Sequence, residues 1–212
     1  TDNIGSTRAQ LEVDRTGVVY LAWDEGWDRV IGHYSPQRQG IYMYSLDGGK
    51  TWESPTFVSY PALSNAQLSV GADGQGGVML VWRAISPEYP DIYYMWSTDY
   101  GASWSPPKTL PSVVSREWNT DYDMYDLATD SAGHIHLLVT GYLSAERVGP
   151  RGIYHFEWDG NDWSSPLRVY EGSWYPEYPH LVIDRGNQLH ATWFIREESW
   201  DCLLYTSDAA DE

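Results

Sequence analysis

The sequence predicts an all-β protein made of repeated four-stranded antiparallel modules. Three observations lead to this prediction. A turn that begins with Asp and has Gly three residues later (two residues later in the fourth copy) precedes an apolar strand four times, and a second turn containing Asp, Gly and Trp recurs in step with it. Aromatic residues, which favour strands, are abundant, with 12 Trp and 17 Tyr among 212 residues.

The first repeated turn opens the second strand of each module. Its four copies begin at Asp14, Asp73, Asp130 and Asp184. The apolar strands that follow end at Trp23, Trp82, Val139 and Trp193, at intervals of 59, 57 and 54 residues. A period of this length is too long for a simple hairpin repeat and suits a four-stranded unit.

The second repeated turn has the pattern Ser-x-Asp-x-Gly-x-Ser/Thr-Trp. The Asp is expected to accept backbone N–H groups of its own turn, the Gly to take a positive φ, and the Trp to bury its ring against the sheet. Two copies are complete and a third keeps only Gly and Trp, with its Asp moved. The residues are Ser45, Asp47, Gly49, Thr51 and Trp52, then Ser97, Asp99, Gly101, Ser103 and Trp104, and finally Gly160 and Trp163.

Each module is expected to hold four short strands, at about 9–13, 18–23, 40–45 and 56–59 in the first module. Four antiparallel strands in 50–60 residues are typical of a β-propeller blade. The modules run over about 7–60, 61–113, 120–172 and 175–201, and the fourth is incomplete. The sequence therefore predicts one domain over 1–201 with about 3.5 blades.

The second turn resembles the Asp-box, or BNR repeat, of the sialidase-like β-propellers. The resemblance implies a six-bladed ring, of which this chain is a fragment with the remaining blades missing from it. It does not define a function, because that family places the turn away from its active site. Residues 202–212 resemble a translated sequencing adapter, so a non-native tail is expected there.

Charge and composition restrict the partners. A formal net charge of −17 disfavours nucleic acid, which requires basic patches. No apolar run is long enough for a membrane span. No cofactor and no metal are expected: His134 and His136 share one strand face, but ordinary strand residues are the favoured interpretation. The predicted location is secreted or cell-envelope, with any signal peptide outside the fragment.

Most candidate binding residues lie in the long, variable segments that follow the second and fourth strands of each module. These segments include 24–39, 83–90, 115–126 and 171–180. Other candidates, such as Arg8, lie where the chain enters an innermost strand and are expected to rim the central channel. Variable loops on a rigid scaffold usually carry function, and aromatic rings beside carboxylates suit sugars. The candidates are Arg8, Asp24, Glu25, Arg29, Arg83, Trp118, Tyr122, Asp126, Trp174, Tyr175, Tyr178, His180 and Arg196.

Three functions remain open. The first is an extracellular propeller that binds carbohydrate or another ligand on the variable face. The second is a glycoside hydrolase, either an exo-sialidase or an enzyme of neutral glycans. The third is a scaffold that binds protein. For a sialidase, the resemblance implies three Arg, a Tyr nucleophile assisted by a Glu, and an Asp acid/base. The family's Phe/Tyr-Arg-Ile-Pro motif is absent, so no residue is assigned a catalytic role, although Arg8, Arg29, Arg83 and Arg196 stand at possible positions.

Overall fold

The computed structural model describes residues 4–28, 33–58, 64–85, 91–115, 125–172, 174–196 and 202–208. Every regular element among them is a β-strand, which confirms the predicted all-β class. The chain divides into two compact units, residues 1–109 and 110–212. Within the described residues there is no helix long and apolar enough to span a membrane.

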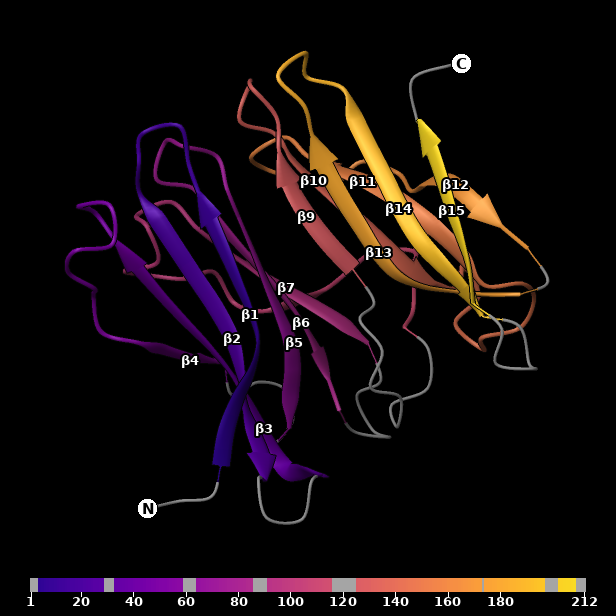
Figure 1. The fold of residues 1–212 in the computed structure, drawn as a ribbon, viewed down its shortest axis with the longest axis horizontal. Coiled ribbons are helices and arrows are strands. Elements are labelled where there is room, and N and C mark those ends of the chain that lie inside the picture. Colours follow the sequence, from indigo (N-terminus) through magenta and orange to yellow (C-terminus); the bar gives the residue numbers. More distant parts are fainter. Residues whose placement is uncertain are drawn as a thin grey trace. The chain divides into compact units, whose positions relative to one another are not determined.

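Unit 1 holds two four-stranded antiparallel sheets, each in simple chain order (Figure 1). The first sheet contains β1 (Ile4–Val13), β2 (Val19–Asp28), β3 (His33–Ser45) and β4 (Thr56–Val58). The second sheet contains β5 (Asn65–Ala72), β6 (Val78–Ala84), β7 (Ile92–Ser97) and β8 (Lys108–Thr109).

Unit 2 holds a third sheet of four strands and a fourth sheet of three. The third sheet contains β9 (Tyr125–Thr129), β10 (Ile135–Gly141), β11 (Gly152–Trp158) and β12 (Leu167–Glu171). The fourth contains β13 (Tyr175–Ile183), β14 (Leu189–Arg196) and β15 (Cys202–Asp208). The tail that the sequence analysis sets apart thus supplies β15, which pairs with β14.

The four turns that begin at Asp14, Asp73, Asp130 and Asp184 share one hydrogen-bond pattern, because in each a single carboxylate oxygen caps two backbone N–H groups. Asp14 Oδ1 accepts from the N–H groups of Thr16 at 2.8 Å and Val18 at 3.1 Å. Asp73, Asp130 and Asp184 accept from the same relative positions, two and four residues ahead. The chain reversal is therefore fixed locally by one side chain.

The two complete boxes also have one geometry. Asp47 Oδ1 accepts from the N–H of Thr51 at 2.8 Å, and Gly49 donates its N–H to Ser45 Oγ at 2.8 Å. In the second box Asp99, Ser97, Gly101 and Ser103 repeat these contacts. The two glycines take φ of 88° and 94°, as the sequence predicts.

The third turn has a different cap. Asp159 Oδ1 accepts from the N–H groups of Asn161 at 2.9 Å and Asp162 at 3.0 Å. Gly160 has a φ of 99°, and Trp158 and Trp163 meet edge to face with centroids 5.4 Å apart. The displaced Asp thus still closes the turn, with the altered geometry that the sequence predicts.

The expectation that both box tryptophans bury their rings is wrong for Trp52. Trp104 packs edge to face on Tyr42 of the preceding sheet, with centroids 5.4 Å apart. Trp52 belongs to the first sheet and is 37% exposed. Within the described residues no sheet precedes the first one, so its ring has no equivalent surface to pack on.

Each unit buries its core between its two sheets. In unit 1, Tyr20, Ala22 and Tyr42 of the first sheet pack with Val70, Leu80 and Trp82 of the second. In unit 2, Leu138 and Ile153 pack with Leu181, Ala191 and Trp193. The alternation of side chains along each strand sends one face of a sheet into this core.

Two of the predicted loops are wrong, because their residues extend strands. The segment 24–39 was expected to be a loop, but β2 continues to Asp28 and β3 starts at His33, with Glu25 paired to Gln39. The segment 171–180 largely belongs to β13, which begins at Tyr175. Polar and aromatic residues in these stretches hide the strand signal, since strand patterns are read from apolar alternation.

Candidate functional site

The innermost strands share an irregularity at one position. Arg8 in β1, Gln67 in β5 and Tyr178 in β13 each lie six residues before the turn Asp, and each has a positive φ, of 53°, 60° and 52°. All three sit where the pairing register with the next strand shifts. A non-glycine residue in this region is strained, and such strain clusters at functional positions.

In unit 1, Asp24 links two of these bulges. Its carboxylate is fully buried and accepts from the N–H of Gln67 at 2.7 Å and the N–H of Leu68 at 3.0 Å. Arg8 places a guanidinium nitrogen 3.7 Å from the same carboxylate. Asp24 therefore fastens β2 to β5 and holds Gln67 in its strained conformation.

Burial dominates the electrostatics of Asp24. Removal from water raises the pKa of Asp24 to about 6, against the lowering effects of the two backbone hydrogen bonds and of Arg8 and Arg38. The carboxyl group thus changes charge near neutral pH, well above the usual range of an aspartate.

A cavity of about 460 Å³ opens beside Arg8 on the first sheet. It is lined by Arg8, Trp23, Glu25, Thr7 and their neighbours on β1 and β2. An aromatic ring, a cation and a carboxylate therefore border one hollow. Trp23 was not among the candidate binding residues, because the sequence analysis gave it only as the end of an apolar strand. Arg8 joins this hollow to the buried carboxylate of Asp24.

Sequence reasoning missed further buried polar groups of unit 1. Arg83 was a candidate and is fully buried, but Arg38 and Asn65 were not considered and are buried as well. Arg38 donates its backbone N–H to Ser64 Oγ at 3.2 Å. Nothing in the local pattern marks these residues, because their burial depends on how β3 and β5 meet.

In unit 2, Asp126 acts as a clamp between the two inner strands. Its carboxylate accepts the N–H of Leu181 at 3.0 Å and lies 3.4 Å from His180 Nδ1. Burial raises the pKa of Asp126, and the Leu181 hydrogen bond and His180 act in the opposite direction. The structure thus brings together two of the predicted candidates, Asp126 and His180.

Arg196 is paired with a residue that sequence reasoning did not select. Its guanidinium contacts both oxygens of Glu177 at 3.0–3.2 Å, and the Glu177 side chain is 3% exposed. This two-pronged ion pair lies across β13 and β14 and orients both side chains. Trp174, just before β13, is 43% exposed.

The remaining candidates stay predictions. Arg29, Trp118 and Tyr122 lie outside the described residues, as does the side chain of Tyr175. In the part of the chain that the structure describes, no group of three or more His, Cys, Asp or Glu side chains is arranged to hold a metal ion. His136 instead faces His155, with ring nitrogens 2.9 Å apart.

Comparison with known proteins finds the Asp-box repeat and one curated relative of low sequence identity. The BNR/Asp-box repeat model matches residues 43–54, which include the first box. The ulvan lyase of Nonlabens ulvanivorans is 22% identical over 201 residues, covering 76% of this chain and 41% of that protein. The chain thus spans less than half the length of this curated relative.

Solved structures show the fold. A protein of unknown function from Dyadobacter fermentans DSM 18053 superposes with a TM-score of 0.67 at 14% identity, over 98% of this chain and 66% of the other. The Trypanosoma rangeli sialidase in complex with sialic acid gives 0.58 at 14% identity, over 96% and 36%. The chain carries the Asp-box repeat and has the fold of the sialidase-like β-propellers.

Proposed function

We propose that this chain is part of an extracellular carbohydrate-active β-propeller, and that it binds a glycan in the cavity at Arg8, Trp23 and Glu25. The observation that carries the proposal is the composition of this cavity at a strained bulge. Arg8 holds a positive φ there although a glycine would adopt it without strain. The bulge recurs with other side chains at Gln67 and Tyr178, so what distinguishes the first sheet is that its bulge brings a guanidinium to the cavity.

The three side chains have complementary roles toward a sugar. The ring of Trp23 offers an apolar plane for the C–H face of a pyranose or furanose. The guanidinium of Arg8 donates to hydroxyl groups or to a sugar carboxylate, and Glu25 accepts from hydroxyl groups. Since the whole chain carries a charge of −17, Arg8 supplies the local positive charge that an anionic sugar needs.

The similar proteins support a glycan as the ligand. The curated relative is an ulvan lyase, and one of the solved structures is a sialidase with bound sialic acid. Their names describe those proteins, and their sequence identity to this chain is low. They support the ligand class, while the cavity supports its place on this chain.

Cleavage of the glycan is the second candidate function. It is favoured by Glu25, because this carboxylate stands on the cavity wall and could act on a bound glycan. Asp24 does not line the cavity, but its contact with Arg8 at 3.7 Å would orient the guanidinium that does. In this case binding and turnover use the same cavity.

The first prediction concerns glycan binding. Arg8→Ala and Trp23→Ala should each weaken binding about tenfold or more, which corresponds to about 1.4 kcal/mol. Calorimetric titration with ulvan, arabinan and sialylated oligosaccharides measures this effect. Arg168→Ala and Trp52→Ala are matched controls, since both side chains are exposed and lie outside the cavity.

The outcome separates the candidates. Equal affinity of the Arg8 and Trp23 variants and of the parent chain would reject the cavity as the site. Release of new sugar ends by the parent chain, lost in Glu25→Gln, would favour the cleaving enzyme. Binding without release favours the binding function.

A further inference from the structure

Asp24 forms an ion pair with the cation of the cavity on the first sheet. Its carboxylate is fully buried and does not line the cavity, whereas the side chain of Arg8 lines it and is 20% exposed. The two charged groups are 3.7 Å apart, which is close enough for an ion pair and too long for a hydrogen bond. The charge of Asp24 therefore acts on Arg8 without touching a ligand in the cavity.

The fold does not require a charged residue at the position of Asp24. This position lies ten residues after the turn Asp, and in the third sheet it is occupied by Thr140. Thr140 also joins its sheet to the next innermost strand, because its hydroxyl donates to the carbonyl of Pro176 at 3.0 Å. A neutral side chain thus makes in unit 2 the kind of link that the Asp24 carboxylate makes to β5 in unit 1.

The fourth sheet has aromatic rings at the two positions of this ion pair. Tyr178 takes the place of Arg8 and Phe194 that of Asp24, each at the same distance from its turn Asp along the sequence. Their rings meet edge to face with centroids 6.1 Å apart. The contact between the two positions recurs, but only the first sheet has residues of opposite charge there. The ion pair is therefore a local feature of the cavity at Arg8.

The charges around this cavity balance while Asp24 is ionised. Arg8 from β1 and Arg38 from β3 act on Asp24 as cations, and β5 contributes two backbone N–H groups. Glu25 adds a second carboxylate at the cavity wall. These two cations and two carboxylates sum to zero, so protonation of Asp24 leaves one positive charge in excess.

The charge of Asp24 changes in a range of pH that a folded protein tolerates. Burial raises the pKa of Asp24 to about 6, although the N–H groups of β5 and both arginines act in the opposite direction. An ionised Asp24 repels a second carboxylate that approaches Arg8, because like charges close together in a partly buried site are weakly screened. The carboxylate of a sugar therefore meets less repulsion after Asp24 has taken up a proton.

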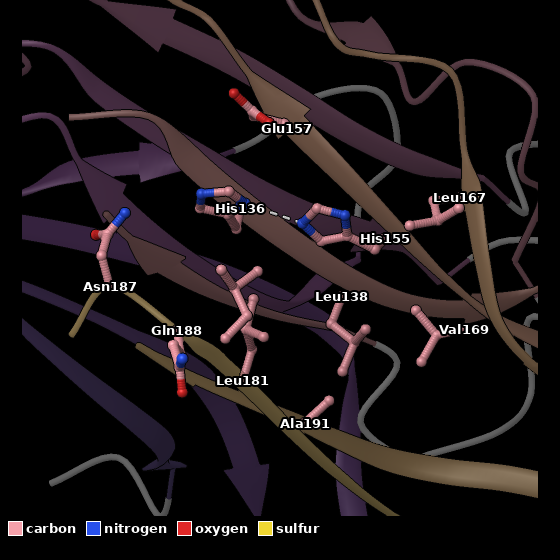
Figure 2. Close-up of a pocket in the computed structure, with 11 residues that line it drawn as sticks. His136, Leu138, His155, Glu157, Leu167, Val169, Leu181, Asn187, Gln188 and Ala191 are labelled. Atoms are coloured by element: carbon pink, nitrogen blue, oxygen red, sulfur yellow. Dashed lines mark hydrogen bonds between the residues drawn. The ribbon is translucent and has the colours of Figure 1, made fainter. Parts of the chain in front are cut away.

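A second cavity, in unit 2, does not have these features. Its volume is about 390 Å³, and Figure 2 shows its two histidines, His136 and His155, with apolar side chains such as Leu181. The described residues that line it include the carboxylate of Glu157 but no arginine or lysine. Of these two cavities, only the one at Arg8 can pair a guanidinium with the carboxylate of a sugar.

We propose that Asp24 selects the charge of the sugar that the cavity at Arg8 binds. While it is ionised, Asp24 neutralises Arg8, and the cavity takes neutral sugars through their hydroxyl groups. Once it is protonated, Asp24 leaves Arg8 free to pair with the carboxylate of an acidic sugar of the uronic acid class. This inference rests on the proposed glycan binding at the same cavity and adds a charge preference that changes with pH.

The test compares two sugars that differ in one group. Methyl β-D-glucoside is neutral, and methyl β-D-glucuronide carries a carboxylate that stays ionised above about pH 5. The parent chain should bind the glucuronide about tenfold more tightly at about pH 5 than at about pH 8, and its affinity for the glucoside should change less than about twofold. Because a bound carboxylate helps Asp24 to keep its proton, the affinity for the glucuronide is highest below about pH 6 and falls as pH rises further. Calorimetric or NMR titration measures both sugars.

Two variants remove the charge of Asp24. Asp24→Asn keeps the size of the side chain, and Asp24→Thr introduces the residue type that the third sheet has at this position. Both should bind the glucuronide at about pH 8 as tightly as the parent chain does at about pH 5, with an affinity that no longer depends on pH. The matched control is Glu25→Gln, which removes the other carboxylate and should keep the pH dependence. Its loss in Glu25→Gln, or its persistence in both Asp24 variants, would overturn the proposal.

Two measurements on the parent chain do not depend on the folding of these variants. In the absence of sugar, the side-chain N–H signal of Arg8 in NMR spectra should move with a midpoint near pH 6. At about pH 6.5, binding of the glucuronide should take up protons, which calorimetry in buffers of different ionisation enthalpy detects. An Arg8 signal that does not change between about pH 5 and about pH 8, or binding without proton uptake, would contradict the proposal.

The proposed function and this inference fail in different ways. If both sugars bind with affinities that are the same at every pH, the cavity is a glycan site and the selection by Asp24 is wrong. If neither sugar binds at any pH, the cavity is not a site for such sugars, and the proposed function is wrong together with the selection.

Discussion

At the scale of single residues, one glycine of the second box is confined by its neighbours as well as by its backbone. A Cβ added at Gly101 would lie 2.6 Å from the Tyr42 ring and 2.8 Å from the Trp104 ring. The equivalent Gly49 has a similar φ, but the nearest atom to a Cβ there is 3.8 Å away. The two positions therefore separate backbone strain from crowding.

Gly49→Ala should cost about 1 kcal/mol of unfolding free energy, from the positive φ alone. Gly101→Ala should cost roughly 3 kcal/mol, because the strain is joined by a clash with two packed rings. Urea unfolding of the two variants measures the difference. Equal losses would mean that the contact between the second box and the first sheet is not tight.

The buried carboxylate of Asp24 predicts a pH effect with a defined sign. Its folded-state pKa of about 6 lies above the unfolded value of about 4. The native state therefore binds more protons between these values, so the Asp24 contribution is complete below about pH 4 and is lost as pH rises through about 6. The parent chain should lose roughly 2–3 kcal/mol over this window relative to Asp24→Asn.

Unfolding free energies of both proteins across this pH range provide the measurement. Subtracting the unfolding free energy of Asp24→Asn from that of the parent chain cancels the contributions of Asp14, Asp47 and Asp99, which both proteins share. Those contributions have the opposite pH dependence, because hydrogen bonds in their turns lower the pKa of these three residues. Asp24→Asn should be less stable at low pH, since its amide N–H meets a backbone N–H of β5. Parallel pH curves for the two proteins would contradict the raised pKa.

At the scale of elements, the bulge in β1 predicts a reversal of the usual glycine effect. Arg8→Gly and Arg8→Ala remove the same side-chain contacts and differ only in backbone freedom. Because φ is 53° at this position, the glycine variant should be more stable than the alanine variant by about 1 kcal/mol. At Gln10, which is regularly paired with Ala22, glycine should be less stable than alanine by about 0.5–1 kcal/mol.

Thermal unfolding of the four variants gives the test. If glycine is more stable than alanine at position 8 and less stable than alanine at position 10, the backbone strain is confined to the bulge. Should the glycine variant be less stable than the alanine variant at both positions, the bulge carries no strain. The proposal that the cavity at Arg8 binds a glycan would then lose its main support.

The sequence predicted those elements whose structure is fixed within a few residues. The four repeated turns that begin with Asp and both boxes are closed by side chains that bond their own turn, so the pattern alone is sufficient. The pairing of Glu177 with Arg196 and of His136 with His155 depends on cross-strand register, which a single sequence does not show. The bulge at Arg8 was missed for the same reason, although Arg8 itself was a candidate.

At the scale of the whole molecule, the acidic composition should oppose folding. A net charge of −17 raises the electrostatic energy of any compact state over that of the extended chain. Ion pairs work against this effect, but several of them are partly exposed, such as Arg168–Glu171, and exposed pairs stabilise little. Repulsion among the carboxylates should therefore outweigh the attraction within ion pairs in the total electrostatic energy of the folded chain.

The last prediction follows from that balance. Raising NaCl from about 0.01 M to about 0.15 M shortens the screening length from about 30 Å to about 8 Å, which weakens repulsion between distant carboxylates more than contacts within an ion pair. Tm should rise by a few degrees, and most of the rise should occur below about 0.15 M. Differential scanning calorimetry measures it, with sucrose as the control for uncharged solute effects. A fall in Tm with salt would show instead that pairs such as Arg196–Glu177 and Arg8–Asp24 dominate the electrostatics of the fold.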